Sequence, residues 1–97
     1  MPLRRFNTKR FGIQNILSTP AVKGVYIIKD RYGRPQYIGK SGNLTRRLLE
    51  HFNDDQIGDA RGFMAYQTKT AGAAASMEER LIRKFCPPYN GTHTEEC

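Results

Sequence analysis

The chain is poor in the features that would place it in a membrane or outside the cell. It has no tryptophan, only two cysteines, and no apolar run long enough to span a bilayer. No apolar stretch follows the basic residues near Met1, as a secretion signal would require. Cys86 and Cys97 are too few for a disulfide framework, so we expect free thiols. These absences predict a cytoplasmic protein with no membrane partner.

Acidic residues are scarce as well. Nine Asp and Glu oppose 16 Lys and Arg, which gives a formal net charge of +7 and an isoelectric point near 9.8. An excess of this size favours binding to polyanions, by counterion release and long-range attraction. Charge alone also fits a basic protein that has no such partner. The length predicts one domain over residues 1–97, with a modest core.

The start of the chain has a composition of its own. The first 23 residues contain five basic residues and no acidic one. A short helix is expected over 12–17, ending before Pro20. We interpret 1–22 as a basic N-terminal extension, either an arm that lies on a phosphate backbone or a cover packed on the domain. Its candidate nucleic-acid contacts are Arg4, Arg5, Lys9 and Arg10.

The remaining sequence predicts the order strand, strand, helix, strand, helix. Runs of β-branched and aromatic residues predict strands over 24–29, 36–39 and 63–68. Apolar residues at helical spacing predict helices over 44–52, capped by Asn43, and over 73–85. Residues 91–97 are expected to be a frayed tail. The expected fold class is α/β (α+β): a small three-stranded, mainly antiparallel sheet flanked by helices, with a possible extra N-terminal helix.

The first two strands are expected to form a hairpin. The stretch Asp30-Arg31-Tyr32-Gly33 has turn composition, and a two-residue loop at its centre places Tyr26 opposite Tyr37. The two phenols then share one face of the sheet. A register slip of one residue would separate them, because successive side chains point to opposite faces.

One carboxylate lies where a helix is otherwise apolar. Glu78 falls near the middle of an apolar arc formed by Ala74, Met77, Leu81, Ile82 and Phe85. Burying a carboxylate is costly unless it is paired, hydrogen-bonded or bound to a metal. Glu78 is therefore either a metal ligand or one partner of a buried salt bridge to a cation such as Arg47 or Lys40.

Several short motifs follow one another along the chain: Gly24-Val25-Tyr26, Tyr37-Ile38-Gly39, Lys40, Arg47, Glu78 and Pro88-Tyr89-Asn90. Over about 20–90 the sequence resembles the GIY-YIG nuclease family, and most closely the N-terminal incision domain of the bacterial nucleotide-excision-repair nuclease. The sequence does not include the long C-terminal region of that nuclease, which leaves a full repair role open. His51 stands where that domain often has tyrosine, as in homing-endonuclease members of the family.

The resemblance implies a metal-dependent DNA endonuclease that cuts a phosphodiester bond by water attack. Glu78 would hold one Mg²⁺ (or Mn²⁺) per active site, since Mg²⁺ often takes only one or two protein carboxylates. Asn90 would orient Glu78 or a metal-bound water. Arg47 would clamp the phosphate oxygens, because its planar fork suits phosphate.

The resemblance also implies how the water loses its proton. Tyr26 is the candidate general base, and its ordinary pKa near 10 would have to be lowered by cations such as Lys40 or the metal. Tyr37 would position the water or share the proton, and His51 would relay the proton or bind phosphate. Each of these residues also has an ordinary structural explanation, as a strand tyrosine, a surface cation or a histidine at the core edge. Further candidate DNA contacts are Lys40, Arg46 and Arg47.

The main alternative is a non-catalytic nucleic-acid-binding accessory module that uses the same basic surface. RNA in place of DNA is a variant of either hypothesis, since the sequence carries no RNA-recognition signature and does not exclude RNA. One active site cuts one strand, so a double-strand break requires a homodimer or two successive nicks by a monomer. The sequence leaves the oligomeric state and the biological role open.

Overall fold

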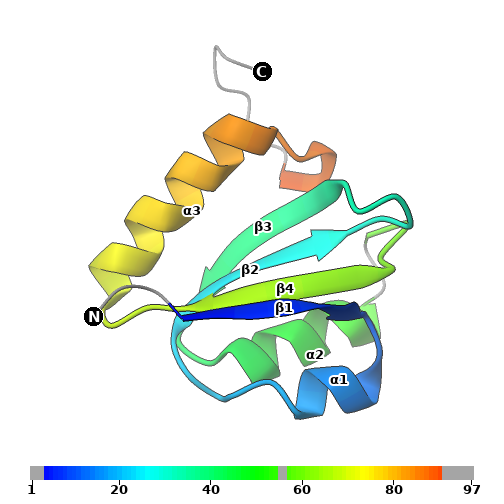
Figure 1. Cartoon of the computed structure of the whole chain (residues 1–97), viewed down its shortest axis with the longest axis horizontal. Coiled ribbons are helices and arrows are strands. Elements are labelled where there is room, and N and C mark those ends of the chain that lie inside the picture. The colour runs from blue at the N-terminus through cyan, green and yellow to red at the C-terminus, as the bar shows by residue number, and fades with distance from the viewer. Residues whose placement is uncertain (1–3, 55–56, 91–97) are drawn as a thin grey trace.

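The chain forms a four-stranded antiparallel sheet with the strand order β1-β4-β2-β3 (Figure 1). A computed structural model describes residues 4–54 and 57–90, with side chains from Thr8 onward. The elements in chain order are β1 (Arg4–Arg10), α1 (Ile13–Leu17), β2 (Gly24–Lys29), β3 (Pro35–Ser41), α2 (Leu44–Asp54), β4 (Gly62–Gln67), α3 (Ala71–Phe85) and the 3-10 turn η1 (Pro88–Asn90). The expected fold class and helices are confirmed, with one strand more than expected.

The additional strand is β1, which the basic start of the chain forms. Its backbone pairs antiparallel with β4, from Arg4 opposite Gln67 to Arg10 opposite Gly62. The segment has few β-branched residues, so composition did not predict a strand here. Backbone pairing with β4 outweighs that weak local preference. The start of the chain is therefore an edge of the sheet itself.

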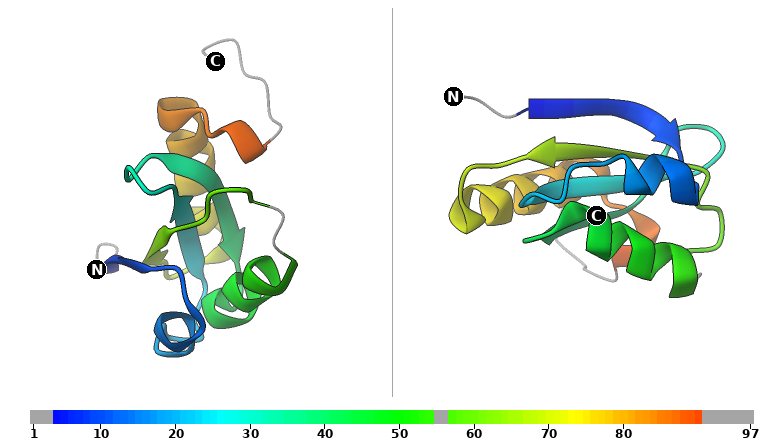
Figure 2. Two further views of the ribbon diagram at one scale, coloured as in Figure 1. Left: turned by 90° about the vertical axis from the view of Figure 1, so that its right-hand side faces the viewer. Right: turned by 90° about the horizontal axis from the view of Figure 1, so that it is seen from below.

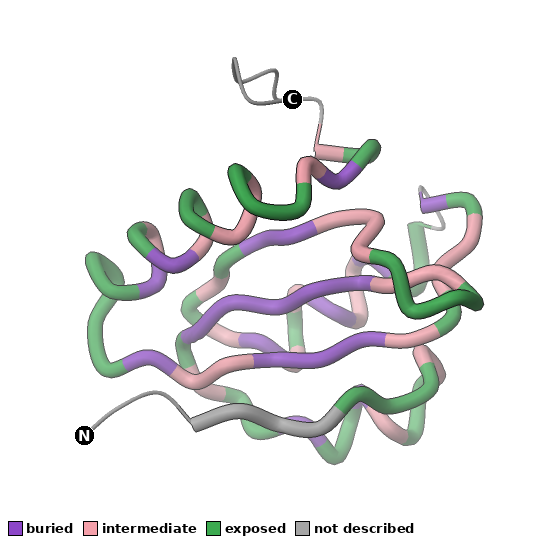
Figure 3. Tube along the Cα trace, turned by 45° about the horizontal axis from the view of Figure 1, so that its top comes forward, coloured by how far each residue is buried: buried purple, intermediate pink, exposed green. Residues whose placement is uncertain are grey.

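Helices cover both faces of the sheet. Figures 1 and 2 show α1 and α2 on one face and α3 on the other. Successive residues of β2 alternate between two cores. Tyr26 packs with Leu48 of α2, whereas Val25 packs with Met77 of α3. Because β2 is buried on both faces, its sequence is almost continuously apolar, and the buried residues run along the central strands in Figure 3.

The register of the β2–β3 hairpin differs from the expected one by two residues. Tyr26 lies opposite Gly39, and Tyr37 lies opposite Ile28. Because a shift of two residues keeps every side chain on its face, Tyr26 and Tyr37 remain neighbours across a diagonal. Their ring centroids lie 6.1 Å apart. The expected face of the two phenols is confirmed, and the expected direct pairing is wrong.

The shift arises in the turn. Asp30 N donates to Arg34 O at 2.9 Å, so the loop holds three residues where two were expected. Gly33 has a φ of 78°, the left-handed conformation that three-residue hairpin loops commonly contain. One further register irregularity lies between Ile28 and Lys29. Together the longer loop and this irregularity account for both residues of the shift.

Side chains cap the two longer helices. Asn43 Oδ1 accepts from Arg46 N at 3.0 Å, as expected for the start of α2. Thr70 Oγ1 accepts from Ala73 N at 3.0 Å, and this cap starts α3 two residues earlier than the sequence predicted. Phe85, which the sequence placed in the apolar arc around Glu78, is exposed in the last turn of α3, and Phe52 is exposed in the last turn of α2.

Candidate active site

Three aromatic side chains meet on the sheet face that α2 covers. Tyr26 comes from β2, Tyr37 from β3 and His51 from the last turn of α2. The Tyr26 hydroxyl lies 2.8 Å from His51 Nε2, and the Tyr37 and His51 ring centroids lie 4.9 Å apart. Tyr26 is 1% exposed and His51 is 8% exposed. The fold therefore brings three of the predicted site residues together, with Tyr26 and His51 buried and Tyr37 partly buried.

Gly39 makes room for this cluster. It lies opposite Tyr26 in the sheet, and a Cβ atom on Gly39 would lie 2.5 Å from Tyr26 Cζ. A contact this short requires the phenol ring to move. The ring has little freedom, because it is buried and its hydroxyl contacts His51. Gly39 in the motif Tyr37-Ile38-Gly39 is therefore required by the ring of Tyr26 in the motif Gly24-Val25-Tyr26.

The Gly39→Ala variant is expected to be less stable than wild type by about 1–3 kcal/mol, the usual cost of overpacking a core. Gly42→Ala is the matched control, because a Cβ atom there meets nothing within 4 Å. That control should change the free energy of unfolding by less than about 0.5 kcal/mol. Urea unfolding of both variants tests the expectation, and equal stabilities would contradict it.

Burial shifts the pKa values of the hydrogen-bonded pair in opposite directions. It lowers the pKa of His51, and Arg47 lowers it further, against the raising effects of Asp54 and Glu50. It raises the pKa of Tyr26 well above its ordinary value, with a further rise from Tyr37 and a lowering effect of Arg47. At neutral pH the pair therefore consists of a neutral phenol and a neutral imidazole. With its proton on Nδ1, His51 accepts the Tyr26 hydroxyl hydrogen at Nε2.

The lowered pKa of His51 predicts a loss of stability in mild acid. The unfolded chain takes up the His51 proton near pH 6.5, above the pKa that His51 has in the folded state. The contribution of His51 is therefore fully present above about pH 6.5 and is lost as the pH falls through its folded pKa. Urea unfolding between pH 7.5 and 5.0 should show a larger loss for wild type than for His51→Gln. Parallel pH profiles for the two proteins would refute this.

Arg47 extends the cluster toward solvent. Its Nη1 lies 2.8 Å from Glu50 Oε1, one turn along α2. This pairing raises the pKa of Arg47 and lowers the pKa of Glu50. Glu50 also pairs with Arg46, so one carboxylate holds both guanidinium groups of α2. Arg47 also lowers the pKa of Tyr26, a role for which the sequence suggested Lys40 or the metal.

Glu78 lies on α3, at the other face of the sheet. Its side chain is 23% exposed, and its Oε1 lies 3.4 Å from Nζ of Lys40. Lys40 comes three residues after Tyr37 on the edge strand β3, so these two side chains leave opposite faces of that strand. Within the described residues no hydrogen bond joins Glu78 to either Tyr26 or Tyr37. Glu78 thus pairs with Lys40, one of the two cations that the sequence suggested, but the pair is partly exposed and not buried.

Asn90 anchors the turn η1 to the edge of the sheet. Its Nδ2 donates to Ile38 O at 2.7 Å, and its Oδ1 accepts from Ile38 N at 2.9 Å. The side-chain amide thereby pairs with the outer backbone groups of β3, as a neighbouring strand would. Asn90 supports the strand that carries both Tyr37 and Lys40. Its expected role at Glu78 or at a metal-bound water stays a prediction.

The predicted nucleic-acid contacts lie on separate surfaces. Arg46 is on the outer side of α2, 3.2 Å from Glu50, and Lys40 is beside α3. Lys9 and Arg10 are exposed at the end of β1. The side chains of Arg4 and Arg5 lie outside the part of the chain that the structure describes.

Cys86 differs from the sequence expectation. It ends α3 in the left-handed conformation, with a φ of 45°, and it is disulfide-bonded rather than a free thiol. The cysteine count argued against a framework of several disulfides and did not exclude a single one. Cys97 and the expected frayed tail 91–97 lie outside the described residues. None of the helices in the described ranges has the length and apolar character needed to cross a bilayer.

The chain is similar in sequence to proteins of one known family. A model of the UvrC-like GIY-YIG domain matches residues 22–91. The chain belongs to this family. The UvrABC system protein C of Dictyoglomus thermophilum is 36% identical over 83 residues, which cover 79% of this chain and 14% of that protein. The protein of the same name from Lawsonia intracellularis is 35% identical over 82 residues, which cover 75% of this chain and 13% of that protein. The chain therefore spans about one seventh of the length of these curated relatives.

Solved structures of the family are also similar to this chain. One is the GIY-YIG N-terminal endonuclease domain of UvrC from Thermotoga maritima, bound to magnesium as its catalytic divalent cation. It is 35% identical with a TM-score of 0.72, and the match covers 80% of this chain and 94% of that domain. A point mutant of the same domain, also bound to its catalytic divalent cation, is 34% identical with a TM-score of 0.73. That match covers 81% of this chain and 93% of the mutant domain. The resemblance inferred from the motifs is thereby confirmed.

Proposed function

We propose that this GIY-YIG domain is a metal-dependent DNA endonuclease that cuts a phosphodiester bond by water attack. The observation that carries the proposal is the buried Tyr26–His51 pair, with its hydroxyl 2.8 Å from Nε2. Two neutral polar groups buried in contact have little value for stability alone, but they suit a proton-transfer step. The similar Thermotoga maritima domain, an endonuclease with a catalytic divalent cation, supports the same reaction class.

Glu78 would hold the divalent cation. No group of three or more His, Cys, Asp or Glu side chains suited to a metal occurs within the described residues. A single accessible carboxylate fits Mg²⁺, which usually keeps several of its waters and takes one or two protein carboxylates. The Lys40 ammonium, at 3.4 Å and half exposed, would give way to the ion at little cost. When bound, Mg²⁺ or Mn²⁺ would supply charge neutralisation at the scissile phosphate and the leaving oxygen.

Tyr26 and His51 would move the proton of the attacking water. The raised pKa of Tyr26 disfavours a standing phenolate, so Tyr26 does not act as a preformed base. It would take the water proton on its hydroxyl oxygen while its own proton passes to Nε2 of neutral His51. The charge then rests on the imidazole, beside Glu50 and Asp54, which favour its protonated form. Tyr37, packed on the same imidazole, would position the water.

The other predicted residues would bind and position. Arg47 would clamp the non-bridging phosphate oxygens, because its guanidinium lies beside Tyr26 and only one of its two forks is needed for Glu50. Lys40 would bind phosphate once Glu78 holds the cation. Asn90 would keep β3 in place through Ile38. In these roles Arg47 would act on the face of the sheet that α2 covers, and Lys40 and the Glu78-bound cation would act on the face that α3 covers.

Incubation of the protein with supercoiled plasmid tests the proposal and adds a metal-removal prediction. Mg²⁺ or Mn²⁺ should produce nicked circles, and an excess of EDTA should abolish nicking, because one carboxylate and Arg47 cannot neutralise the transition state alone. If the protein binds DNA with a steep salt dependence but never nicks it in either metal, the accessory-module alternative prevails. A panel of single strands, flaps, junctions and an RNA duplex in the same assay would identify the preferred substrate.

A further inference from the structure

A second cationic site lies where β1 and β2 end and β4 begins. Arg10 and Lys29 both pair with Gly62 there, so these strand ends lie side by side. They surround a cleft of about 290 Å³. Five cationic side chains line this basic cleft, namely Lys9, Arg10, Lys29, Arg31 and Arg61. None of the five has a role in the chemistry proposed above.

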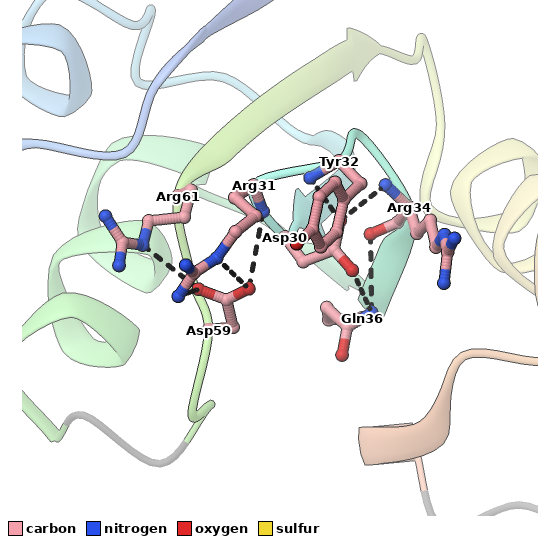
Figure 4. Close-up of polar contacts among 7 residues, drawn as sticks. All are labelled: Asp30, Arg31, Tyr32, Arg34, Gln36, Asp59 and Arg61. Atoms are coloured by element: carbon pink, nitrogen blue, oxygen red, sulfur yellow. Dashed lines mark hydrogen bonds and ion pairs between the residues drawn. The ribbon is translucent and has the colours of Figure 1, made fainter.

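Two of the arginines are held in place by one carboxylate, as Figure 4 shows. Arg31 Nε lies 3.3 Å from Asp59 Oδ2, and Arg61 Nε lies 3.0 Å from Asp59 Oδ1. The two guanidinium groups come from different segments, the β2–β3 turn and the loop that ends just before β4. Asp59, whose pKa Arg31 lowers, therefore fixes their spacing and leaves most of their donors available.

The second nearby carboxylate is committed to the turn. Asp30 Oδ1 accepts from the backbone N atoms of Tyr32 (2.8 Å) and Arg34 (2.9 Å), and Oδ2 accepts from Gln36 Nε2 (3.3 Å; Figure 4). Lys29 Nζ contacts a hydroxyl, Thr8 Oγ1, at 3.0 Å. Within the described residues, Lys9, Arg10 and Lys29 form no ion pair. The basic cleft thus keeps an excess of positive charge, and Asp59 and Asp30 hold two of its arginines and its turn in place.

A phosphodiester backbone is the ligand that this arrangement suits. Guanidinium forks bind phosphate oxygens, and lysines add point charges. Lys29 follows Tyr26 by three residues on β2, which at about 3.3 Å per residue is about 10 Å along the strand. DNA rises about 3.4 Å per nucleotide, so about three nucleotides span that distance. Lys29 leaves the face of β2 opposite Tyr26, since it contacts Thr8, whose hydroxyl donates to Met64 in the core under α3. It therefore lies on the face of the sheet that carries Glu78, and a DNA strand bound at Glu78 can continue along that face to the basic cleft.

We propose that the basic cleft binds the sugar–phosphate backbone of DNA, a few nucleotides from the bond that is cut. It is a second anchor for the strand, separate from the Arg47 clamp. The proposal rests on DNA being the substrate of the proposed nuclease. Binding and cleavage are separate measurements, however, so either claim can fail without the other.

The test compares two double variants that remove the same kind and amount of charge. Arg10→Gln with Lys29→Gln changes the basic cleft, and Arg80→Gln with Lys84→Gln changes exposed positions on α3. None of these four residues forms an ion pair within the described part of the chain, so no carboxylate loses a partner. Fluorescence anisotropy of a labelled 20-base-pair DNA duplex in EDTA gives affinity between 50 and 200 mM salt without cleavage. Thermal melting confirms that both variants fold.

Loss of two phosphate contacts should lower the slope of log affinity against log salt by about 2 for the cleft variant, and by much less for the α3 variant. At 50 mM salt the cleft variant should bind about tenfold more weakly. In plasmid nicking its KM should rise while kcat at saturating DNA stays at the wild-type value. Equal effects in the two variants, unchanged binding in both, or no DNA binding by wild type would each overturn the proposal. If wild type binds DNA through the cleft but does not nick it, the proposed binding site is supported and the proposed nuclease activity is refuted.

Discussion

The Glu78→Ala variant is expected to nick supercoiled plasmid at least about 100-fold more slowly than wild type in Mg²⁺. A divalent cation at the scissile phosphate contributes several kcal/mol to the transition state, and about 2.7 kcal/mol already corresponds to 100-fold. Stability should change little, because the Lys40 pair that is lost is half exposed. Plasmid nicking rates and urea unfolding measure the two quantities side by side.

Glu79→Ala is the matched control for this prediction. Glu79 is the next residue of α3, its side chain is 65% exposed, and it pairs with Arg83 at 3.0 Å. The two variants lose the same charge from the same helix, but only Glu78 meets the edge strand β3 through Lys40. Near wild-type activity is expected for Glu79→Ala. Equal activity of the two variants would contradict the assignment of Glu78 as the metal ligand of the active site.

The Tyr26→Phe variant should be slower by about 10²–10⁴-fold, the usual contribution of general acid–base catalysis. It removes only the hydroxyl that contacts His51 Nε2 and keeps the ring that fills the space over Gly39. The buried imidazole nitrogen is left without its partner, so the variant should also be about 1–3 kcal/mol less stable. Single-turnover cleavage at saturating metal, with unfolding measured in parallel, tests both effects.

Tyr66→Phe is the control for the loss of a phenol. Tyr66 lies on β4, half buried and packed in the core under α3, away from His51. We expect wild-type cleavage from this variant. Wild-type cleavage by Tyr26→Phe as well would show that the hydroxyl takes no part in proton transfer, and would leave the Tyr26–His51 pair with a purely structural role.

Local patterns predicted most of the elements and both faces of β2. The helix over 44–52 was found within two residues of its observed end, since Asn43 and a regular apolar stripe mark it clearly. The face shared by Tyr26 and Tyr37 was also predicted, because it depends only on the alternation of side chains along a strand. Helical periodicity alone placed Glu78 on the apolar side of its helix, where its side chain is 23% exposed.

The errors share one cause, which is that each depended on a partner distant in sequence. The strand β1 forms because β4 offers a free edge to a segment with little β preference of its own. The need for glycine at position 39 comes from the Tyr26 ring, which belongs to another strand. Asn90 pairs with Ile38, 52 residues earlier, which no spacing rule could have indicated. The basic cleft is invisible in sequence, because its cations come from two strands, a turn and the loop before β4.

The order of residue types along the chain therefore determined the family, the chemistry expected of each side chain, and which side of its element each one occupies. Those properties follow from local geometry, the two-residue repeat of a strand and the 3.6-residue turn of a helix. Only the folded chain decided that Arg47 and not Lys40 acts on Tyr26, that His51 stays neutral beside it, and that five cations form one cleft. A pKa shift and a shared binding surface both depend on desolvation and on distances between segments, and packing alone sets these.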